Sequence, residues 1–359
     1  MLPYLILLFC AIICSCIESK KSKLIISSTL MLIMMLMCGF RGSECGTDTM
    51  AYHRMAYDMY GGYIPPIYEP LIILANLFPL PHVAFCMFMA MLTYIPLFFV
   101  IYKQSDNIGM SVLLFMITGA VFFLETFNLA KECVALSFLM LAIYVYPTRN
   151  LLGVLFFILA FLFHSFTALF IPFLLLRNIA LSKSKIIVIL LISSLLGITS
   201  SYILADGAIG LITDMVSNSD STTIKHLAKY SDYEYQVDFT MIGALNHILP
   251  MFALCVLTYN DSSKSSNYYK MMFWGTVIIS LNVGNIFCER TAAFYSIATI
   301  LAVPESLRYS TIHTKRMVNG LLILMIMLYI YNMRSMMIMN LNGVHVTPIP
   351  YKSFVSSSL

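Results

Sequence analysis

Charge is scarce in this chain. Asp, Glu, Lys and Arg make up 11% of its 359 residues, whereas soluble globular proteins carry about 25%. Apolar side chains account for 60% of the residues instead, compared with about 45–50% in soluble proteins. This shortage of charge excludes an ordinary soluble fold.

The chain also lacks the motifs of nucleotide and metal chemistry. It has no Walker loop, no GxGxxG fingerprint and no DxD acid pair, so a reaction driven by a soluble nucleotide is disfavoured. None of its nine cysteines forms a CxxC pair, and we interpret them as small residues of a membrane core. We therefore expect no cofactor and no metal. The net charge of +4 is scattered between apolar segments, which gives no reason to expect a nucleic-acid partner.

What the chain does have is a series of apolar runs, each about 17–20 residues long and able to cross the bilayer as a helix. The runs lack the alternation of barrel strands. They predict an all-α, polytopic membrane protein with about 12 transmembrane helices, in a range of about 10–13. The expected segments are residues 2–17, 24–40, 83–102, 108–124, 129–146, 151–163, 165–176, 186–203, 241–258, 271–287, 291–307 and 317–333.

The distribution of basic residues predicts the topology. If the turn at residues 18–23 is cytoplasmic, 13 of the 21 Lys and Arg residues lie inside, and cytoplasmic loops normally carry this excess. Both termini of this inner-membrane protein are then periplasmic, and loops 41–70 and 204–240 are external. Residues 70–77 are too short to span and are expected in the outer interface. Residues 151–176 are compatible with two crossings, two half-helices or one tilted helix.

The first loop is the first place that could carry chemistry. Arg41 follows the second expected helix and has glycines nearby, so its guanidinium could hold a phosphate at headgroup depth. The alternative is an interfacial arginine that extends toward water. Asp48 and Glu69 are candidate bases or sugar ligands. The tyrosines of the loop, Tyr52 among them, fit either an aromatic belt or sugar binding.

A second group surrounds the start of the fifth expected helix. Glu125, Asn128 and Glu132 follow an i, i+3, i+7 pattern, with Lys131 beside them, and on one helix they would share an arc of about 120°. Ionisable groups at a membrane are costly unless they are paired. The group predicts either a functional cavity or a structural ion-pair network.

Two further groups lie later in the chain. His164 interrupts an apolar run and is either a packing residue or a ligand-site residue. Glu289 and Arg290 follow Asn282 and Asn285 in a second i, i+3, i+7 pattern. In the predicted topology all four groups lie at the outer face of the membrane.

These residues resemble the motifs of the EpsG/Wzy family of polysaccharide polymerases. FRGSECGTDTMAY from residue 40 is similar to that family's first external loop, and NLAKECVALSFLMLAIYV resembles its next motif, with Lys131 where the family commonly has Arg. FLFHSFTALFIP resembles its His motif, CERTAAFYSIATILAVP its late Arg-Tyr helix, and VTPIPYKSF its closing Pro-Tyr segment. The resemblance covers most of the chain, in the same order.

The resemblance implies a fold related to membrane glycosyltransferases and O-antigen ligases. It also implies transfer of a glycan from undecaprenyl diphosphate to the next lipid-linked repeat unit, on the periplasmic side. The expected partners are both lipid-linked glycans and the bilayer, with a chain-length regulator and a flippase as further candidates. An O-antigen ligase, a transporter and a structural subunit are the alternatives. Candidate bases are Glu69, Asp48, His164 and Glu289; candidate diphosphate ligands are Arg41, Lys131 and Arg290; candidate substrate ligands are Tyr52, Glu125, Asn128, Glu132 and Tyr295.

Overall fold

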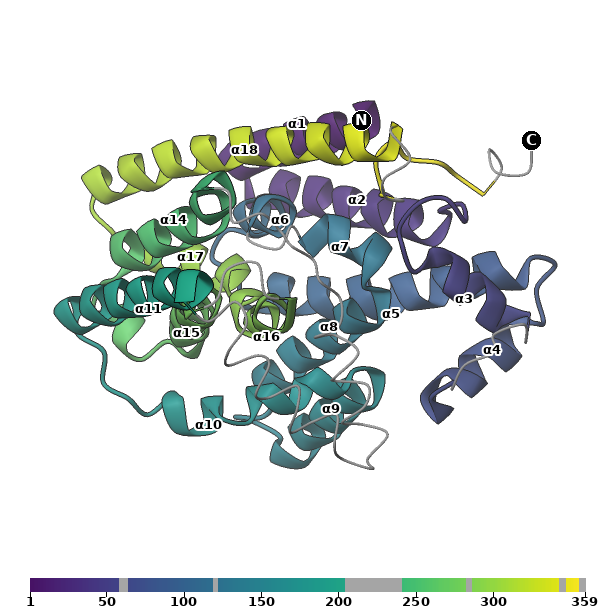
Figure 1. The fold of residues 1–359 in the computed structure, drawn as a ribbon, viewed down its shortest axis with the longest axis horizontal. Coiled ribbons are helices and arrows are strands. Elements are labelled where there is room, and N and C mark those ends of the chain that lie inside the picture. The colour runs from purple at the N-terminus through teal and green to yellow at the C-terminus, as the bar shows by residue number, and fades with distance from the viewer. Residues whose placement is uncertain (58–63, 119–121, 204–240, 282–285, 342–346, 355–359) are drawn as a thin grey trace.

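The fold is all-α. We describe it from a computed structural model, in which residues 1–57, 64–118, 122–203, 241–281, 286–341 and 347–354 are described. These residues form helices, and the β interaction found among them is an isolated antiparallel bridge between Arg41 and Ser353. Helices α1 and α18 lie along one edge of the molecule in Figure 1, and α9 and α10 lie toward the opposite edge. The all-helical class predicted from the composition is confirmed.

The first half of the chain contains the helices that carry most of the candidate site. Proline occupies the first turn of α1 and of α5, where it needs no helical partner. The Asn107 side chain caps α6 by accepting the Met110 N–H at 3.2 Å. The elements are α1 (Leu2–Cys16), α2 (Lys20–Gly39), α3 (Thr49–Ala56), η1 (Pro66–Tyr68), α4 (Glu69–Ala75), α5 (Pro81–Gln104), α6 (Ile108–Ile117), α7 (Phe122–Asn128), α8 (Ala130–Val145) and α9 (Asn150–Phe163).

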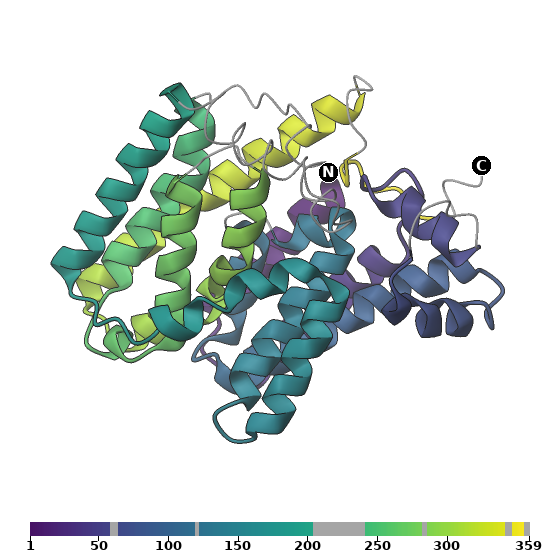
Figure 2. The same cartoon turned by 60° about the horizontal axis from the view of Figure 1, so that its bottom comes forward.

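The second half adds a group of neighbouring helices. Figure 2 shows α11, α14 and α15 running beside one another, and the three pack together. Helix α16 packs on α15 and also touches α8, which joins the two halves. The elements are η2 (Ser165–Phe170), α10 (Phe173–Leu176), α11 (Lys183–Ile203), α14 (Met241–Thr258), η3 (Ser262–Lys264), α15 (Asn267–Leu281), α16 (Ile286–Ser296), α17 (Thr299–Arg308) and α18 (Ile312–Leu341).

Each of the twelve expected segments has a helical counterpart. Among the described residues, three helices are long and apolar enough to cross a membrane: α2, α5 and α18. Helices α6 and α7, which meet at an angle of 56°, make a fourth if they are one span. These helices support a membrane protein, whereas the number of about twelve crossings stays a prediction. The external loop predicted at 204–240 lies outside the described residues.

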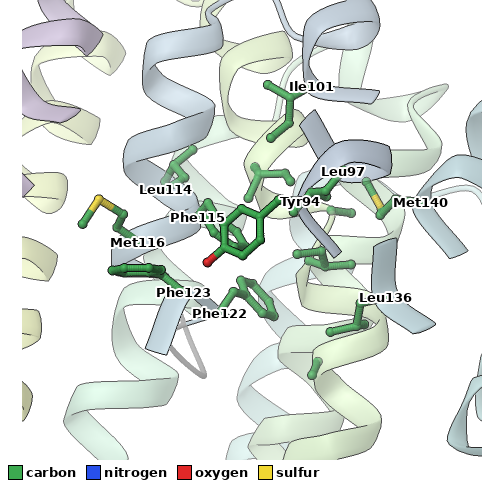
Figure 3. Packing of buried hydrophobic residues seen from close by; sticks show 14 of the residues in the cluster. Tyr94, Leu97, Ile101, Leu114, Phe115, Met116, Phe122, Phe123, Leu136 and Met140 are labelled. Atoms are coloured by element: carbon green, nitrogen blue, oxygen red, sulfur yellow. The ribbon is translucent and has the colours of Figure 1, made fainter. Parts of the chain in front are cut away.

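The core lies where α5, α6, α7 and α8 meet. Figure 3 shows Tyr94 of α5 among Phe115, Phe122 and Leu136 from the other three helices. The Tyr94 hydroxyl pairs with the Thr126 hydroxyl at 3.0 Å, so the one polar atom of this side chain is satisfied. This packing fixes α7 and the start of α8 against α5.

The apolar piece at residues 70–77 forms α4, which has seven residues. A helix of this length rises about 10 Å and cannot cross a bilayer. The side chains of Ile73 and Leu77 are 68% and 76% exposed, as an element in the membrane interface would require. Its position relative to the membrane stays a prediction.

The long apolar run at 151–176 is broken at His164, which has extended backbone angles. Helix α9 ends at Phe163, and the chain continues as the 3₁₀ helix η2 and the four-residue α10. The run is therefore not one tilted helix. Of the three arrangements expected, the short second piece favours a half-helix over a full crossing.

The end of the chain folds back onto the first loop. We call residues 347–354 the C-terminal brace. The Pro348 carbonyl oxygen accepts the Tyr4 hydroxyl at 2.6 Å, and the Lys352 carbonyl oxygen accepts the Gly42 N–H at 2.8 Å. The Lys352 ammonium group also pairs with Glu44. The brace thus joins α1 to the loop that follows α2.

Candidate active site

Arg41 anchors the first loop to the carboxyl end of α7. Its Nη1 donates to the Thr126 carbonyl oxygen at 3.1 Å and to the Cys38 carbonyl oxygen at 3.2 Å. Its Nε donates to the Thr49 hydroxyl at 2.9 Å. The last carbonyls of a helix have no partners within the helix, and a nearby guanidinium satisfies them. Arg41 is 1% exposed, so these contacts connect the loop to α7.

Gly46 and Thr47 bring the loop against the end of the same helix. Gly46 has a φ of +98°, and a Cβ at this position would clash with the Phe127 carbonyl oxygen. Only glycine fits such a close approach without strain. The Thr47 N–H donates to the Asn128 side-chain oxygen at 3.2 Å. Asn128 therefore holds the loop, and its predicted role as a substrate ligand stays a prediction.

Asp48 follows these contacts and is half-buried. Burial raises the pKa of Asp48, and the charges of Lys131 and Arg290 oppose this rise. Because the charges of both cations act on this carboxyl group, Asp48 lies in the same region as Lys131 and Arg290. The three residues come from distant parts of the sequence. The docked loop thus delivers a carboxylate to the start of α8.

The polar residues at 125–132 do not lie on one helix. Helix α7 ends at Asn128 and α8 begins at Ala130, with Leu129 in a non-helical conformation between them. The predicted arc on a continuous helix is wrong, because the contacts of the first loop replace the hydrogen bonds that would continue α7. Glu125 still lies within electrostatic range of Glu132.

Lys131 and Glu132 occupy the first turn of α8 and meet Arg290 of α16. The Arg290 Nε lies 3.9 Å from Glu132 Oε2, an ion-pair distance that is too long for a hydrogen bond. Glu132 also lies within electrostatic range of Asp48. We call Asp48, Glu125, Lys131, Glu132 and Arg290 the charged cluster.

His164 lies beside the charged cluster, at the break between α9 and η2. It is within electrostatic range of Arg290 and Lys131. Its ring lies against those of Phe166 and Phe294, with centroid distances of 5.1 and 6.1 Å. Its Nδ1 is buried and has no hydrogen-bond partner among the described residues. The imidazole of His164 thus lies between two aromatic rings and the cations of the charged cluster.

The other predicted site residues have different surroundings. Tyr52 is buried beside the guanidinium of Arg41, 5.8 Å from ring centroid to Cζ. Tyr295 is 1% exposed and donates to the Leu169 carbonyl oxygen at 2.8 Å, which fixes α16 to η2. Glu289 lies within electrostatic range of Glu125. Glu69 is exposed at the start of α4, and no interaction between it and the charged cluster is found among the described residues.

Tyr68 is a contact that sequence reasoning did not single out. It is fully buried, and its hydroxyl donates to the Phe163 carbonyl oxygen at 3.0 Å, next to His164. Its ring also packs on that of Phe163. A tyrosine just before Glu-Pro was visible in the loop, but nothing in the sequence indicated a partner 95 positions away.

Two predicted polar residues of the fourth group, Asn282 and Asn285, lie outside the described residues. In the part of the chain that the structure describes, no three His, Cys, Asp or Glu side chains are placed to hold a metal ion. Within the described residues, the members of the charged cluster come from the first loop, from α7 and the start of α8, and from α16.

Comparison with known proteins gives one match. The family model described as EpsG family matches residues 24–353 of the 359. No curated protein and no solved structure matches the chain. The matched range begins within α2 and ends in the C-terminal brace, so it contains every residue of the charged cluster.

Proposed function

The chain belongs to the EpsG family, and from this premise we propose that it polymerises undecaprenyl-diphosphate-linked repeat units into a surface polysaccharide. In each cycle the growing glycan leaves its lipid diphosphate and is joined to a hydroxyl of the next lipid-linked unit. Family membership supports a polymerase of this kind. The apolar helices support a membrane-resident donor.

The observation that carries the proposal is the charged cluster. Lys131 and Arg290 come from α8 and α16, and the same small region holds three acids. Glycosyl transfer from a lipid diphosphate requires cations for the departing diphosphate and a base near the acceptor hydroxyl. Ionisable groups gathered between membrane helices are energetically costly, and such groups usually mark a functional site.

We assign the departing diphosphate to Lys131 and Arg290. Lys131 lies in the first turn of α8, where the helix dipole also favours an anion. Arg290 can offer two parallel N–H groups to a phosphate. Asp48 senses both cations and in this proposal holds them in place before the donor arrives. Arg41, which bonds to the protein, positions the loop that carries Asp48.

The proposed location is the periplasmic side of the inner membrane. It is supported by the excess of Lys and Arg in the loops expected to be cytoplasmic. With about twelve crossings, the first loop and the start of α8 would both lie on the periplasmic side, opposite these cytoplasmic loops. Lipid-linked units would arrive there through a flippase, and a chain-length regulator would act on the growing product.

The test uses the protein purified into lipid nanodiscs and lipid-linked repeat units extracted from a strain that lacks this gene. Wild-type protein is expected to convert single units into a ladder of longer glycans. Lys131→Ala and Arg290→Ala are each expected to lower the rate at least 100-fold, because removal of one donor to a transition-state anion costs about 10²–10³ in rate.

Matched controls are Lys264→Ala and Arg308→Ala. Both residues form exposed ion pairs, with Asp261 and Asp106 respectively, so each change removes the same kind of charge outside the cluster and should leave the rate unchanged. A ladder of normal rate and length from Lys131→Ala and Arg290→Ala would overturn the proposed roles. Transfer of single units to another acceptor, with no ladder, would instead indicate a ligase.

A further inference from the structure

Several buried hydrogen-bonding atoms of the described residues have no hydrogen-bond partner there, and two of them lie in or beside the charged cluster: Oε2 of Glu132, a member of the cluster, and Nδ1 of His164. Leaving a buried polar atom without a hydrogen bond costs about 1–3 kcal/mol, and native proteins leave few such atoms. A pair of them in one region therefore indicates a ligand that would supply the missing hydrogen bonds.

The surroundings of Glu132 show what kind of ligand would fit. Its side chain is 4% exposed, and its contact with Arg290 is too long for a hydrogen bond. The carboxylate is therefore held near a cation but keeps one oxygen available to a donor. A sugar hydroxyl is such a donor, and the rings of Phe166 and Phe294 beside His164 offer flat apolar faces for a pyranose.

We propose that Glu132 binds the attacking hydroxyl of the acceptor glycan and removes its proton, while His164 Nδ1 hydrogen-bonds a second hydroxyl of the same sugar. This inference rests on the proposed function. It assigns the acceptor site to Glu132, His164 and the aromatic rings beside His164, and it makes Glu132 a catalytic residue.

The other acids fit this role less well. Glu69 is exposed at the start of α4. Glu125 is half-buried, and neither of its carboxylate oxygens is among the buried atoms without a hydrogen-bond partner. Asp48 interacts electrostatically with both Lys131 and Arg290, which suits an acid that orients these cations. Among these acids, Glu132 is the one with a buried, unpartnered oxygen.

The reaction balances with these groups alone. The acceptor oxygen forms a bond to the anomeric carbon of the donor glycan as its proton moves to Glu132. The bond between that carbon and the diphosphate oxygen breaks, and its electron pair leaves with the lipid diphosphate. Lys131 and Arg290 stabilise the negative charge of this leaving group. Glu132 then returns the proton to water.

The experiment compares Glu132→Gln with wild type in the nanodisc assay. Gln keeps the size of the side chain but cannot take the proton, so turnover should fall by about 10²–10⁴, the range contributed by a general base. Affinity for the lipid-linked unit, measured by its effect on the melting temperature, should stay within about threefold. Glu132→Asp should restore part of the turnover, which shows a need for the carboxylate.

His164→Ala should raise KM for the acceptor about tenfold with a smaller effect on kcat, because it removes a hydrogen bond made before the reaction. The control is Glu305→Gln, a half-buried acid outside the cluster that accepts a hydrogen bond from Ser266 at 2.6 Å; the turnover of this variant should match wild type. Normal turnover in Glu132→Gln would overturn the assignment, as would a loss of donor affinity equal to its loss of rate. If wild-type protein forms no glycan ladder, the proposed function itself fails.

Discussion

Nη1 of Arg41 donates a hydrogen bond of 3.1 Å to the carbonyl oxygen of Thr126, although 85 positions separate the two residues in the sequence. The bond ties the first loop to the end of α7, the helix that carries Glu125 and Asn128. It links Arg41 to the charged cluster through the protein itself. Loss of this side chain should therefore alter the position of the loop first.

The first prediction is that Arg41→Ala destabilises the protein. A hydrogen bond that involves a charged group contributes about 1.5–3 kcal/mol, and the Thr126 carbonyl would keep the weaker Cys38 thiol donor at 3.2 Å. The melting temperature in detergent micelles should fall by several degrees. In Arg41→Lys, which keeps the charge but loses the planar guanidinium group, the melting temperature should fall by less.

The same measurement separates this role from a direct one. If Arg41 were a diphosphate ligand, Arg41→Ala would melt like wild type and would lose affinity for the lipid-linked donor. A variant that melts normally but no longer binds donor contradicts the structural role. One that melts early and regains donor binding when the temperature is lowered supports it.

The second prediction concerns Gly46→Ala. The positive φ of 98° and the nearby Phe127 carbonyl oxygen leave no space for a methyl group, so the loop must move off the end of α7. We expect destabilisation of more than about 1 kcal/mol and a loss of polymer, since Asp48 would move with the loop. Gly320→Ala is the control: a Cβ added at this position of α18 would have no atom from outside its own helix turn within 4 Å, and the change should stabilise this helix by about 0.5–1 kcal/mol.

The third prediction concerns the C-terminal brace. A chain ending at Val346 loses the hydrogen bonds from Tyr4 to Pro348 and from Gly42 to Lys352, whereas a chain ending at Phe354 keeps them. The shorter chain should show faster proteolysis within the first loop and little polymer. Equal protection of the loop in both chains would mean that Arg41 and Gly46 hold it without the brace.

The positions of the helices could be predicted from the sequence because long apolar runs have few other solutions in a membrane. The break between α7 and α8 could not. No proline or glycine lies at residues 128–130, and α7 ends there because groups from the first loop, Arg41 among them, take its last carbonyls. Such tertiary contacts override the local pattern of the chain.

The sequence predicted which residues belong to the candidate site better than it predicted their positions and contacts. Lys131, Glu132 and Arg290 were identifiable as charges at the ends of apolar runs, where charge is costly. The sequence could not distinguish Arg41 from them, because an arginine that caps a helix and one that binds a phosphate can both follow a membrane segment. Burial and the hydrogen bonds of Nε and Nη1 support a capping role for Arg41, and both depend on residues far away in the sequence.

The fourth prediction is a loss of stability in mild acid that depends on His53. This residue of α3 lies 4.5 Å from His82, between ring centroids, and burial, then the charges of His82 and Arg41, lowers the pKa of His53 to about 4. In the unfolded chain its pKa is about 6.5, so the unfolded state takes up the proton first as the pH falls. Stability is therefore complete above about pH 6.5 and declines toward pH 4.

The expected loss between about pH 7.5 and pH 5 is about 1–2 kcal/mol, discounted because His53 is only partly buried. Melting temperatures in detergent measure it. His53→Gln should flatten the pH dependence, whereas His313→Gln, at an exposed position near the start of α18, should leave it unchanged. Because Tyr57 also bonds to His82, at 2.6 Å, a dependence that survives in His53→Gln but disappears in His82→Gln would assign the titration to His82 instead.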